Sequence, residues 1–196
     1  MDQVCPSPGP TVTGMDLFEA HADVSVRFAE LCTGVTDWDA PTPVKEWAAR
    51  DVVIHLATWL RELLGSHRVE LPAVDTQQDP ADLWVEHTEN VARLIQTDSA
   101  KTILTDQGEQ TVGEIISTLY VPDVFMHQYD IAKSSGQEVG WDDETLRHTL
   151  AAVEPRAAAL QGSGQFGVPV VLDESHSLED RLASLIGRDP NWTPQS

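Results

Sequence analysis

Cysteine and positive charge are scarce in this sequence. Its two cysteines, Cys5 and Cys32, cannot build a disulfide framework. Only 12 of the 196 residues are lysine or arginine, against 32 acidic residues, which gives a net charge of −20. A surface this acidic repels phosphate backbones and anionic lipids. We therefore expect neither nucleic acid nor a membrane surface among the partners.

Several further features are missing. No apolar run is long enough to cross a membrane, and no leader pattern of charged and then apolar residues opens the sequence. The sequence also lacks a Cys-x-x-Cys pair, a glycine-rich phosphate loop and a Ser-His-Asp order of catalytic residues. These absences favour a cytoplasmic protein whose chemistry depends on other groups.

What the sequence does contain is helical periodicity. With 41% hydrophobic residues it can form a core, and its apolar residues recur at intervals of three and four. Four long helices with short or moderate connections predict an all-α fold, a four-helix bundle with a C-terminal extension. Helices are predicted at about 15–34, 48–65, 80–96, 111–136, 142–153 and 177–187, with a short extended segment at 166–171.

Local signals place several of the helix starts. Asp79 is predicted as an N-cap followed by Pro80 in the first turn. Thr111 and Glu114 have the spacing of a capping box. Pro122 falls inside the fourth helix, so a kink or a fresh helical start is expected there.

The composition divides the chain into three segments. Residues 1–14 are rich in proline and glycine and are predicted to form a flexible arm. Residues 15–136 are predicted to form the bundle, and residues 137–196 a helical extension packed on it. No apolar stripe requires self-association, although an exposed patch on a bundle helix would support a homodimer.

The segment 122–130, PDVFMHQYD, raises the question of function. Asp123, His127 and Asp130 fall within about 60° of one another on a helical wheel. The helix around them is apolar nearly all round, with Leu119 among the flanking residues, which predicts burial. A buried carboxylate needs compensation. A metal ion, a hydrogen-bonded Asp–His–Asp cluster and an opening into a wet cleft each provide it.

A metal ion would need a third ligand from another helix. Three histidines, His21, His55 and His87, lie on predicted core-facing stripes. A lone histidine on an apolar face is more often a core residue than a ligand. His55 is the best placed of the three, in the second turn of a well-capped helix.

Three motifs resemble a known family. They are APTPVKEWAARDVVIHL at 40–56, DVFMHQYDIAKSSGQ at 123–137, and FGVPVVLDESHSLEDRLASLIGRDPNW at 166–192. In this order they are similar to the DinB-like superfamily, in the actinobacterial branch related to the N-terminal domain of mycothiol-dependent maleylpyruvate isomerase. Members of that branch are four-helix bundles that bind a divalent metal, zinc or nickel.

The resemblance implies a ligand set and a co-substrate. Carried over by position, the metal ligands would be His55, Asp123 and His127. Asp130 would either orient an imidazole ligand or place a charge on the open side of the metal. The isomerase has Glu where this chain has Asp123. Residues 137–196 are too few for the isomerase's C-terminal domain, so the isomerase reaction itself does not follow from the resemblance. The implied co-substrate is mycothiol, a low-molecular-weight thiol.

Two classes of function remain open at this point. An enzyme would use an open metal position to activate a thiol for S-transfer or isomerisation of an electrophilic substrate, or to activate water for hydrolysis. A non-catalytic bundle would close the site with a fourth protein ligand and act through a partner surface. His21, His87 and Asp130 are the candidates for that fourth ligand. In the closing motif, Arg188 and Asp189 are predicted to pair as part of a packing clamp.

Overall fold

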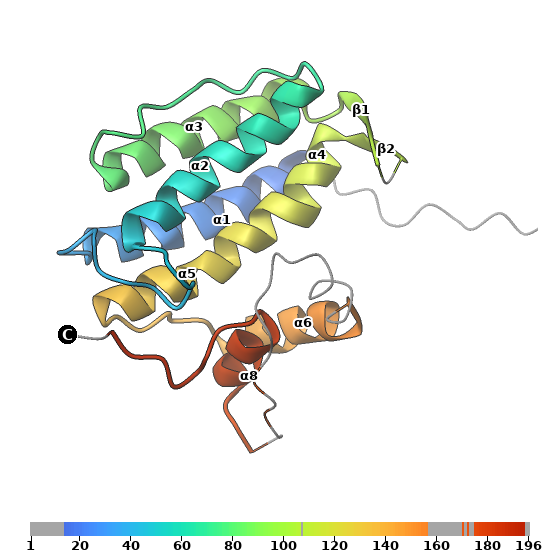
Figure 1. Cartoon of the computed structure of the whole chain (residues 1–196). Helices are drawn as coiled ribbons and strands as arrows, with labels where there is room; N and C mark the ends of the chain where they lie inside the picture. The colour runs from blue at the N-terminus through green and yellow to red at the C-terminus, as the bar shows by residue number, and fades with distance from the viewer. Residues whose placement is uncertain (1–13, 107, 157–169, 171, 173–174, 195–196) are drawn as a thin grey trace, which may run out of the picture.

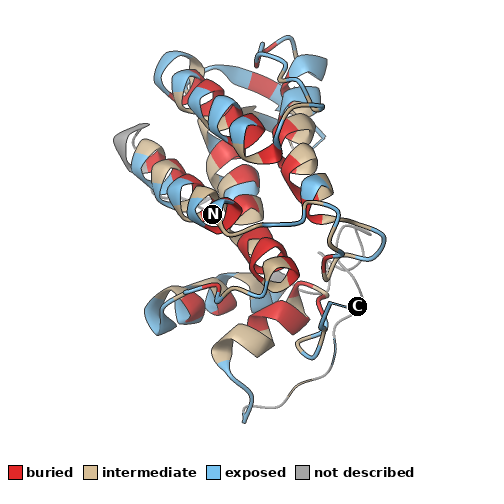
Figure 2. Ribbon diagram, turned by 90° about the vertical axis from the view of Figure 1, so that its left-hand side faces the viewer, coloured by how far each residue is buried: buried red, intermediate tan, exposed pale blue. Residues whose placement is uncertain are grey.

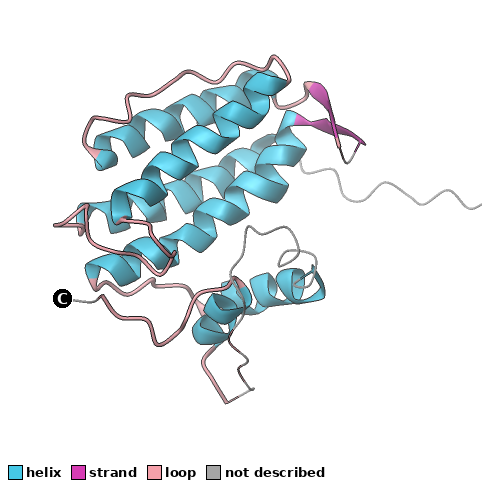
Figure 3. Cartoon of the chain, viewed as in Figure 1, coloured by secondary structure: helices cyan, strands magenta, loops and turns pink. Residues whose placement is uncertain are grey.

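The computed structural model describes residues 14–106, 108–156, 170, 172 and 175–194. Helices dominate the described residues, as predicted, and these residues also contain one small hairpin (Figure 3). The segment expected to be extended, 166–171, lies outside the described residues except for residue 170. The elements are α1 (Gly14–Thr33), α2 (Ala49–Ser66), α3 (Pro80–Asp98), β1 (Thr102–Thr105), β2 (Gly108–Thr111), α4 (Val112–Ile115), the π-helical turn η1 (Ile116–Tyr120), α5 (Val121–Ser135), α6 (Asp143–Val153), the 3₁₀ turn η2 (Glu154–Arg156) and α8 (Leu178–Leu185).

Four helices form the bundle that the periodicity predicted. α1 and α2 each pack against both α3 and α5, so that each helix has two neighbours. The fourth member is continuous from α4 through η1 into α5 (Figure 1). The connection 67–79 runs back along the bundle, and α2 and α3 therefore run in the same direction.

The core of the bundle is a continuous apolar cluster. Each helix turns its buried face inward and its exposed face to solvent (Figure 2). On α3 the buried side chains Leu83, His87, Val91 and Leu94 follow one another at intervals of three and four residues. The chain thus buries the stripes that its periodicity marks.

Side-chain caps fix the helix starts. Asp79 Oδ1 accepts a hydrogen bond of 2.9 Å from the amide of Ala81, with Pro80 in the first turn. Thr111 and Glu114 form the predicted capping box, with both reciprocal bonds present. These signals are local in sequence, and the structure confirms them.

The cap at Asp79 gives a stability prediction. Asp79→Ala leaves amides of the first turn of α3 without their acceptor and should lower the free energy of unfolding by about 1 kcal/mol. Asp79→Asn keeps a side-chain acceptor and should stay within a few tenths of the native value. Urea unfolding followed by circular dichroism measures both. An equal loss in the two variants would argue against the cap.

The hairpin of β1 and β2 was not predicted. The segment before Thr111 was expected to be only a polar turn, yet Thr102 pairs with Thr111 and Thr105 with Gly108 in antiparallel register. The residues of β1, Thr-Ile-Leu-Thr, include β-branched side chains that favour a strand. Thr111 therefore ends β2 and caps α4 at once.

The proline in the fourth helix produces a π-helical turn. Pro122 lacks an N–H, so the regular i→i−4 ladder cannot run through it. The helix instead adds one residue over η1, where the amide of Val121 bonds to the carbonyl of Ile116. The extra residue rotates Leu119 outward to 44% exposure, so its predicted burial was wrong. π-bulges of this kind are frequent at functional sites.

The C-terminal extension packs on the outer side of α5. Leu146, Leu150, Leu182 and Ile186 of the extension form a second apolar cluster, against which Phe125 and Met126 of α5 pack. α5 is therefore covered by the bundle on one side and by the extension on the other, which makes it the central helix. Among the described residues, no helix combines the length and apolarity needed to cross a bilayer.

Candidate metal centre

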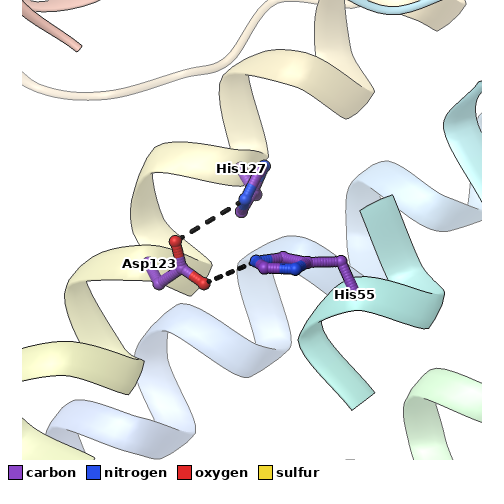
Figure 4. A group of neighbouring side chains, drawn as sticks. All are labelled: His55, Asp123 and His127. Atoms are coloured by element: carbon purple, nitrogen blue, oxygen red, sulfur yellow. Dashed lines mark hydrogen bonds and ion pairs between the residues drawn. The ribbon is translucent and has the colours of Figure 1, made fainter. Parts of the chain in front are cut away.

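Two helices bring the three predicted ligands together. His55 projects from α2 and meets Asp123 and His127, which lie one turn apart on α5 (Figure 4). His55 Nε2 lies 3.2 Å from Asp123 Oδ2, and His127 Nε2 lies 3.6 Å from Asp123 Oδ1. The two imidazole rings are nearly edge to face, with centroids 5.1 Å apart.

These residues suit a divalent cation. One ligand atom from each of His55, Asp123 and His127 lies within 4.8 Å of the others. In a tetrahedral site with bonds of about 2.1 Å, neighbouring ligand atoms are about 3.4 Å apart, close to the two distances measured to Asp123. Two imidazoles and a carboxylate form a donor set that zinc and nickel accept.

The site is partly open to solvent at one end. The side chains of His55 and Asp123 are 31% and 23% exposed, whereas that of His127 is 6% exposed. Burial raises the pKa of the Asp123 carboxyl, but the charge of His127 and the hydrogen bond and charge of His55 outweigh it and hold the pKa below its usual range. Asp123 is therefore an anion at neutral pH, ready to act as a ligand.

Asp130 contacts His127 on the ring nitrogen that faces away from Asp123. His127 Nδ1 donates a hydrogen bond of 2.8 Å to Asp130 Oδ2. This bond keeps the proton on Nδ1 and leaves Nε2, the atom that faces Asp123, free to bind a metal. Asp130 itself is fully buried.

The buried carboxylate of Asp130 is compensated by an arginine, which none of the three predicted compensations included. Arg188 Nη2 donates to Asp130 Oδ2 at 2.8 Å and Nε donates to Oδ1 at 3.1 Å. Burial raises the pKa of Asp130, but the charge and hydrogen bonds of Arg188, together with His127, lower it below its usual range.

The predicted pairing of Arg188 with Asp189 was therefore wrong. Asp189 Oδ1 instead accepts from the amide of Asn191, in a turn that follows Arg188. The physical reason is burial: Arg188 is 8% exposed and lies next to a buried anion. The sequence held one signal for this pair. A buried Asp130 favours a cationic partner, and only 12 basic residues are available to provide it.

The other core histidines have partners away from the centre. His87 Nε2 shares a hydrogen bond of 2.9 Å with the Tyr120 hydroxyl, and His21 Nε2 lies 3.3 Å from the Ser25 hydroxyl. Among the described residues, the group that could hold a metal contains His55, Asp123 and His127 and no fourth member. Both side chains are buried in the core, with exposed fractions of 2% for His21 and 0% for His87.

An indole forms one wall of the centre, which the sequence did not indicate. The Trp47 ring is stacked on that of His127, with centroids 5.9 Å apart, and tilted against that of His55 at 5.0 Å. A tight turn presents this side chain, since Thr42 and Trp47 are joined by a backbone hydrogen bond of 2.9 Å. Glu46, just before the indole, has a φ of 68°, a left-handed conformation that costs a non-glycine residue about 1 kcal/mol or more.

Comparisons with known proteins agree with this geometry. The family model of the mycothiol maleylpyruvate isomerase N-terminal domain matches residues 21–132, more than half of the chain, including His55, Asp123 and His127. Two proteins of Mycobacterium tuberculosis, the uncharacterized proteins MT0763 and Rv0738, are each 27% identical over 187 residues, which cover 89% of this chain and 98% of theirs. No solved structure matches the chain.

Proposed function

The chain belongs to the family of the mycothiol maleylpyruvate isomerase N-terminal domain, and on this premise we propose that it is a metal-dependent enzyme that activates a low-molecular-weight thiol. His55, Asp123 and His127 hold a divalent cation, zinc or nickel. Three protein ligands with one position left for a small molecule are typical of catalytic zinc sites. The thiol suggested by the family is mycothiol.

One observation carries this proposal. The three candidates for a fourth ligand are engaged elsewhere: Asp130 by Arg188, His87 by Tyr120 and His21 by Ser25. At the same time, the side chains of His55 and Asp123 are partly exposed. A cation held by the three side chains would therefore keep a coordination position without a ligand from the described residues.

The bound cation supplies Lewis acidity, which lowers the pKa of a thiol in the open position. The residues of the chain hold the geometry for that chemistry. Asp123 contributes a negative charge that balances the cation, and Asp130 keeps the Nδ1 proton of His127 in place. The Trp47 ring packs against both imidazoles and so limits access to the centre from one side.

The thiol has to come from outside the chain, as far as the described residues go. Cys32 is their free cysteine and is 3% exposed. Burial, with a smaller contribution from the charge of Asp79, raises the pKa of its thiol to about 12. At neutral pH this thiol stays protonated and is not a nucleophile.

Two reactions follow from an activated thiol and an electrophilic substrate. A thiolate that forms a bond to a carbon atom of the substrate, while the leaving group on that carbon departs with the electron pair of the broken bond, gives an S-transferase. A thiolate that adds to a double bond, and leaves again after the bond has rotated, gives a cis–trans isomerase. The acidic surface is no obstacle to mycothiol, whose sugar and inositol groups are uncharged.

The test is direct binding of a thiol at the centre. Protein loaded with Co²⁺ should develop a thiolate-to-cobalt charge-transfer band in the near ultraviolet when N-acetylcysteine or mycothiol is added. N-acetyl-S-methylcysteine, which has no free thiol, should give no band. A Co²⁺ spectrum that neither thiol changes would contradict an open position and favour a non-catalytic metal-binding bundle.

A further inference from the structure

A guanidinium from the C-terminal extension is fixed rigidly against α5. Arg188 uses Nε and Nη2 on the two oxygens of Asp130, at 3.1 Å and 2.8 Å, and Nη1 on the carbonyl of Ile186 at 2.9 Å. Two parallel bonds between a guanidinium and a carboxylate define orientation as well as distance. Asp130 therefore cannot rotate without breaking one of them.

Asp130 transmits this constraint to a proposed ligand. Its Oδ2 accepts from both Arg188 Nη2 and His127 Nδ1, each at 2.8 Å. The position of that one oxygen sets the plane of the imidazole and hence the direction of Nε2. The path from Arg188 to the metal-binding face thus runs through two hydrogen bonds with no exposed group between them.

The end of α8 aims the arginine at this carboxylate. The amide of Gly187 donates to the carbonyl of Ser184 at 2.9 Å, and the amide of Arg188 donates to the carbonyl of Ala183 at 2.8 Å. Gly187 has a φ of 78°, so this is a Schellman motif with glycine in the left-handed position. The motif turns the chain sharply after α8 and directs Arg188 toward α5.

Apolar packing holds that turn in place. Leu182 and Ile186 are fully buried in the second apolar cluster, where Phe125 and Met126 of α5 pack against them. The guanidinium position is therefore set by the docking of the extension on α5. Without that docking, Asp130 would lose its cation.

We propose that Arg188 is a positioning residue of the metal centre, which makes the C-terminal extension a working part of a site whose ligands all lie in the bundle. The inference rests on the proposed metal site. Arg188 holds Asp130, Asp130 holds His127, and His127 presents Nε2 to the cation. Loss of the group that hydrogen-bonds a metal ligand directly, here Asp130, typically lowers metal affinity 10- to 100-fold, and Arg188 acts on the ligand through that group.

The first experiment compares zinc affinity in Arg188→Lys, Arg181→Leu and the native protein by competition with a chromophoric chelator. Arg188→Lys keeps the charge but loses the two parallel bonds, and should weaken zinc binding by up to about 10-fold, the lower end of the range for loss of Asp130 itself. Arg181 is the matched control, because it lies on α8 but binds Glu154 at 3.0 Å, far from the path to His127. Its variant should bind zinc as the native protein does.

The visible spectrum of Co²⁺-loaded protein provides a second readout. A reoriented His127 changes the ligand field, so the d–d bands should shift in Arg188→Lys and stay unchanged in Arg181→Leu. A folded Arg188→Lys variant with native zinc affinity and a native Co²⁺ spectrum would overturn the inference. If the native protein bound no metal, the proposed function would fail instead, which keeps the two failures distinct.

The pathway through Asp130 is tested by a double variant. The double variant Arg188→Leu/Asp130→Asn removes both buried charges and leaves none unpaired. It should therefore remain folded even if Arg188→Leu alone does not. Its zinc affinity should equal that of Asp130→Asn alone, because Arg188 then has no carboxylate to hold. A further loss of affinity from Arg188→Leu in the Asp130→Asn background would contradict the pathway.

Discussion

His127→Ala should lower the affinity of the protein for zinc by more than about 100-fold, since loss of a direct ligand costs more than the 10- to 100-fold typical of an outer-shell partner. The variant removes Nε2, the atom 3.6 Å from Asp123 Oδ1, and leaves two protein ligands. His55→Ala should have a similar effect, because it removes the contribution of α2. Competition with a chromophoric chelator at fixed pH measures both affinities.

The matched control is another buried histidine of the same bundle. His87 is fully buried but bonds to Tyr120 rather than to the centre. His87→Leu should cost stability, because the Tyr120 hydroxyl loses its partner, yet it should leave zinc affinity within a few-fold of native. Retention of one tightly bound zinc per chain in His127→Ala would show that the ligand assignment is wrong.

Acid should destabilise the metal-free protein well above the pH at which most carboxylates titrate. Burial lowers the pKa of His21 to about 4, and burial with the added charge of His21 lowers the pKa of His87 to about 3. Both values lie below the ordinary histidine pKa of about 6.5 that the unfolded chain shows. Below about pH 6.5 the unfolded chain therefore binds protons that the folded protein does not. The free energy of unfolding consequently decreases as the pH is lowered.

The expected effect is large. Each histidine costs up to about 1.4 kcal/mol per pH unit in this window, so the pair costs up to about 5 kcal/mol between pH 6.5 and 4.5. That amount approaches the whole stability of many domains, about 5–15 kcal/mol. The lowered pKa values of Asp123 and Asp130 add to the loss only below the ordinary carboxyl pKa of about 4, where the unfolded chain takes up protons that these two carboxylates in the folded protein do not. We expect the free energy of unfolding of the metal-free protein to decline steadily as the pH falls from about 6.5 to 4.5.

A double variant isolates the contribution of His87. His87→Leu/Tyr120→Phe removes the imidazole and the hydroxyl that bonds to it, so no buried polar partner is left over. Its stability should fall less steeply between pH 6.5 and 4.5 than that of the native protein, as measured by urea unfolding at a series of pH values. His148→Leu, at an exposed histidine, should follow the native curve. Coincident native and double-variant slopes would rule out His87 as a source of acid sensitivity.

The parts of this fold that the sequence predicted correctly are those with local causes. Asp79 caps a helix through amides two residues away, and the Thr111–Glu114 box closes within four residues. The shared face of Asp123 and His127 follows from helical geometry alone. The pairing of α2 with α5 at His55 needed the family resemblance, because spacing in sequence carries no information on which helices meet.

The features that were missed depend on long-range or cooperative effects. Arg188 lies 58 residues from Asp130, and only the docking of the extension brings them together. The π-helical turn follows from the way the helix accommodates Pro122, and it moves Leu119 from the predicted buried face to the surface. The β1–β2 hairpin required two short segments to pair with each other, which a helical reading of the chain overlooked.

Elemental analysis tests the central claim most directly, on protein purified without a histidine tag beside its Asp123→Ala variant. Asp123 lies between the two imidazoles, so its removal should leave the centre without its anionic ligand. We predict about one equivalent of zinc or nickel per chain in the native protein and a large loss of it in the variant. A native protein without metal, even after gentle refilling with zinc and nickel, would contradict the metal centre and leave a hydrogen-bonded His–Asp–Arg cluster in its place.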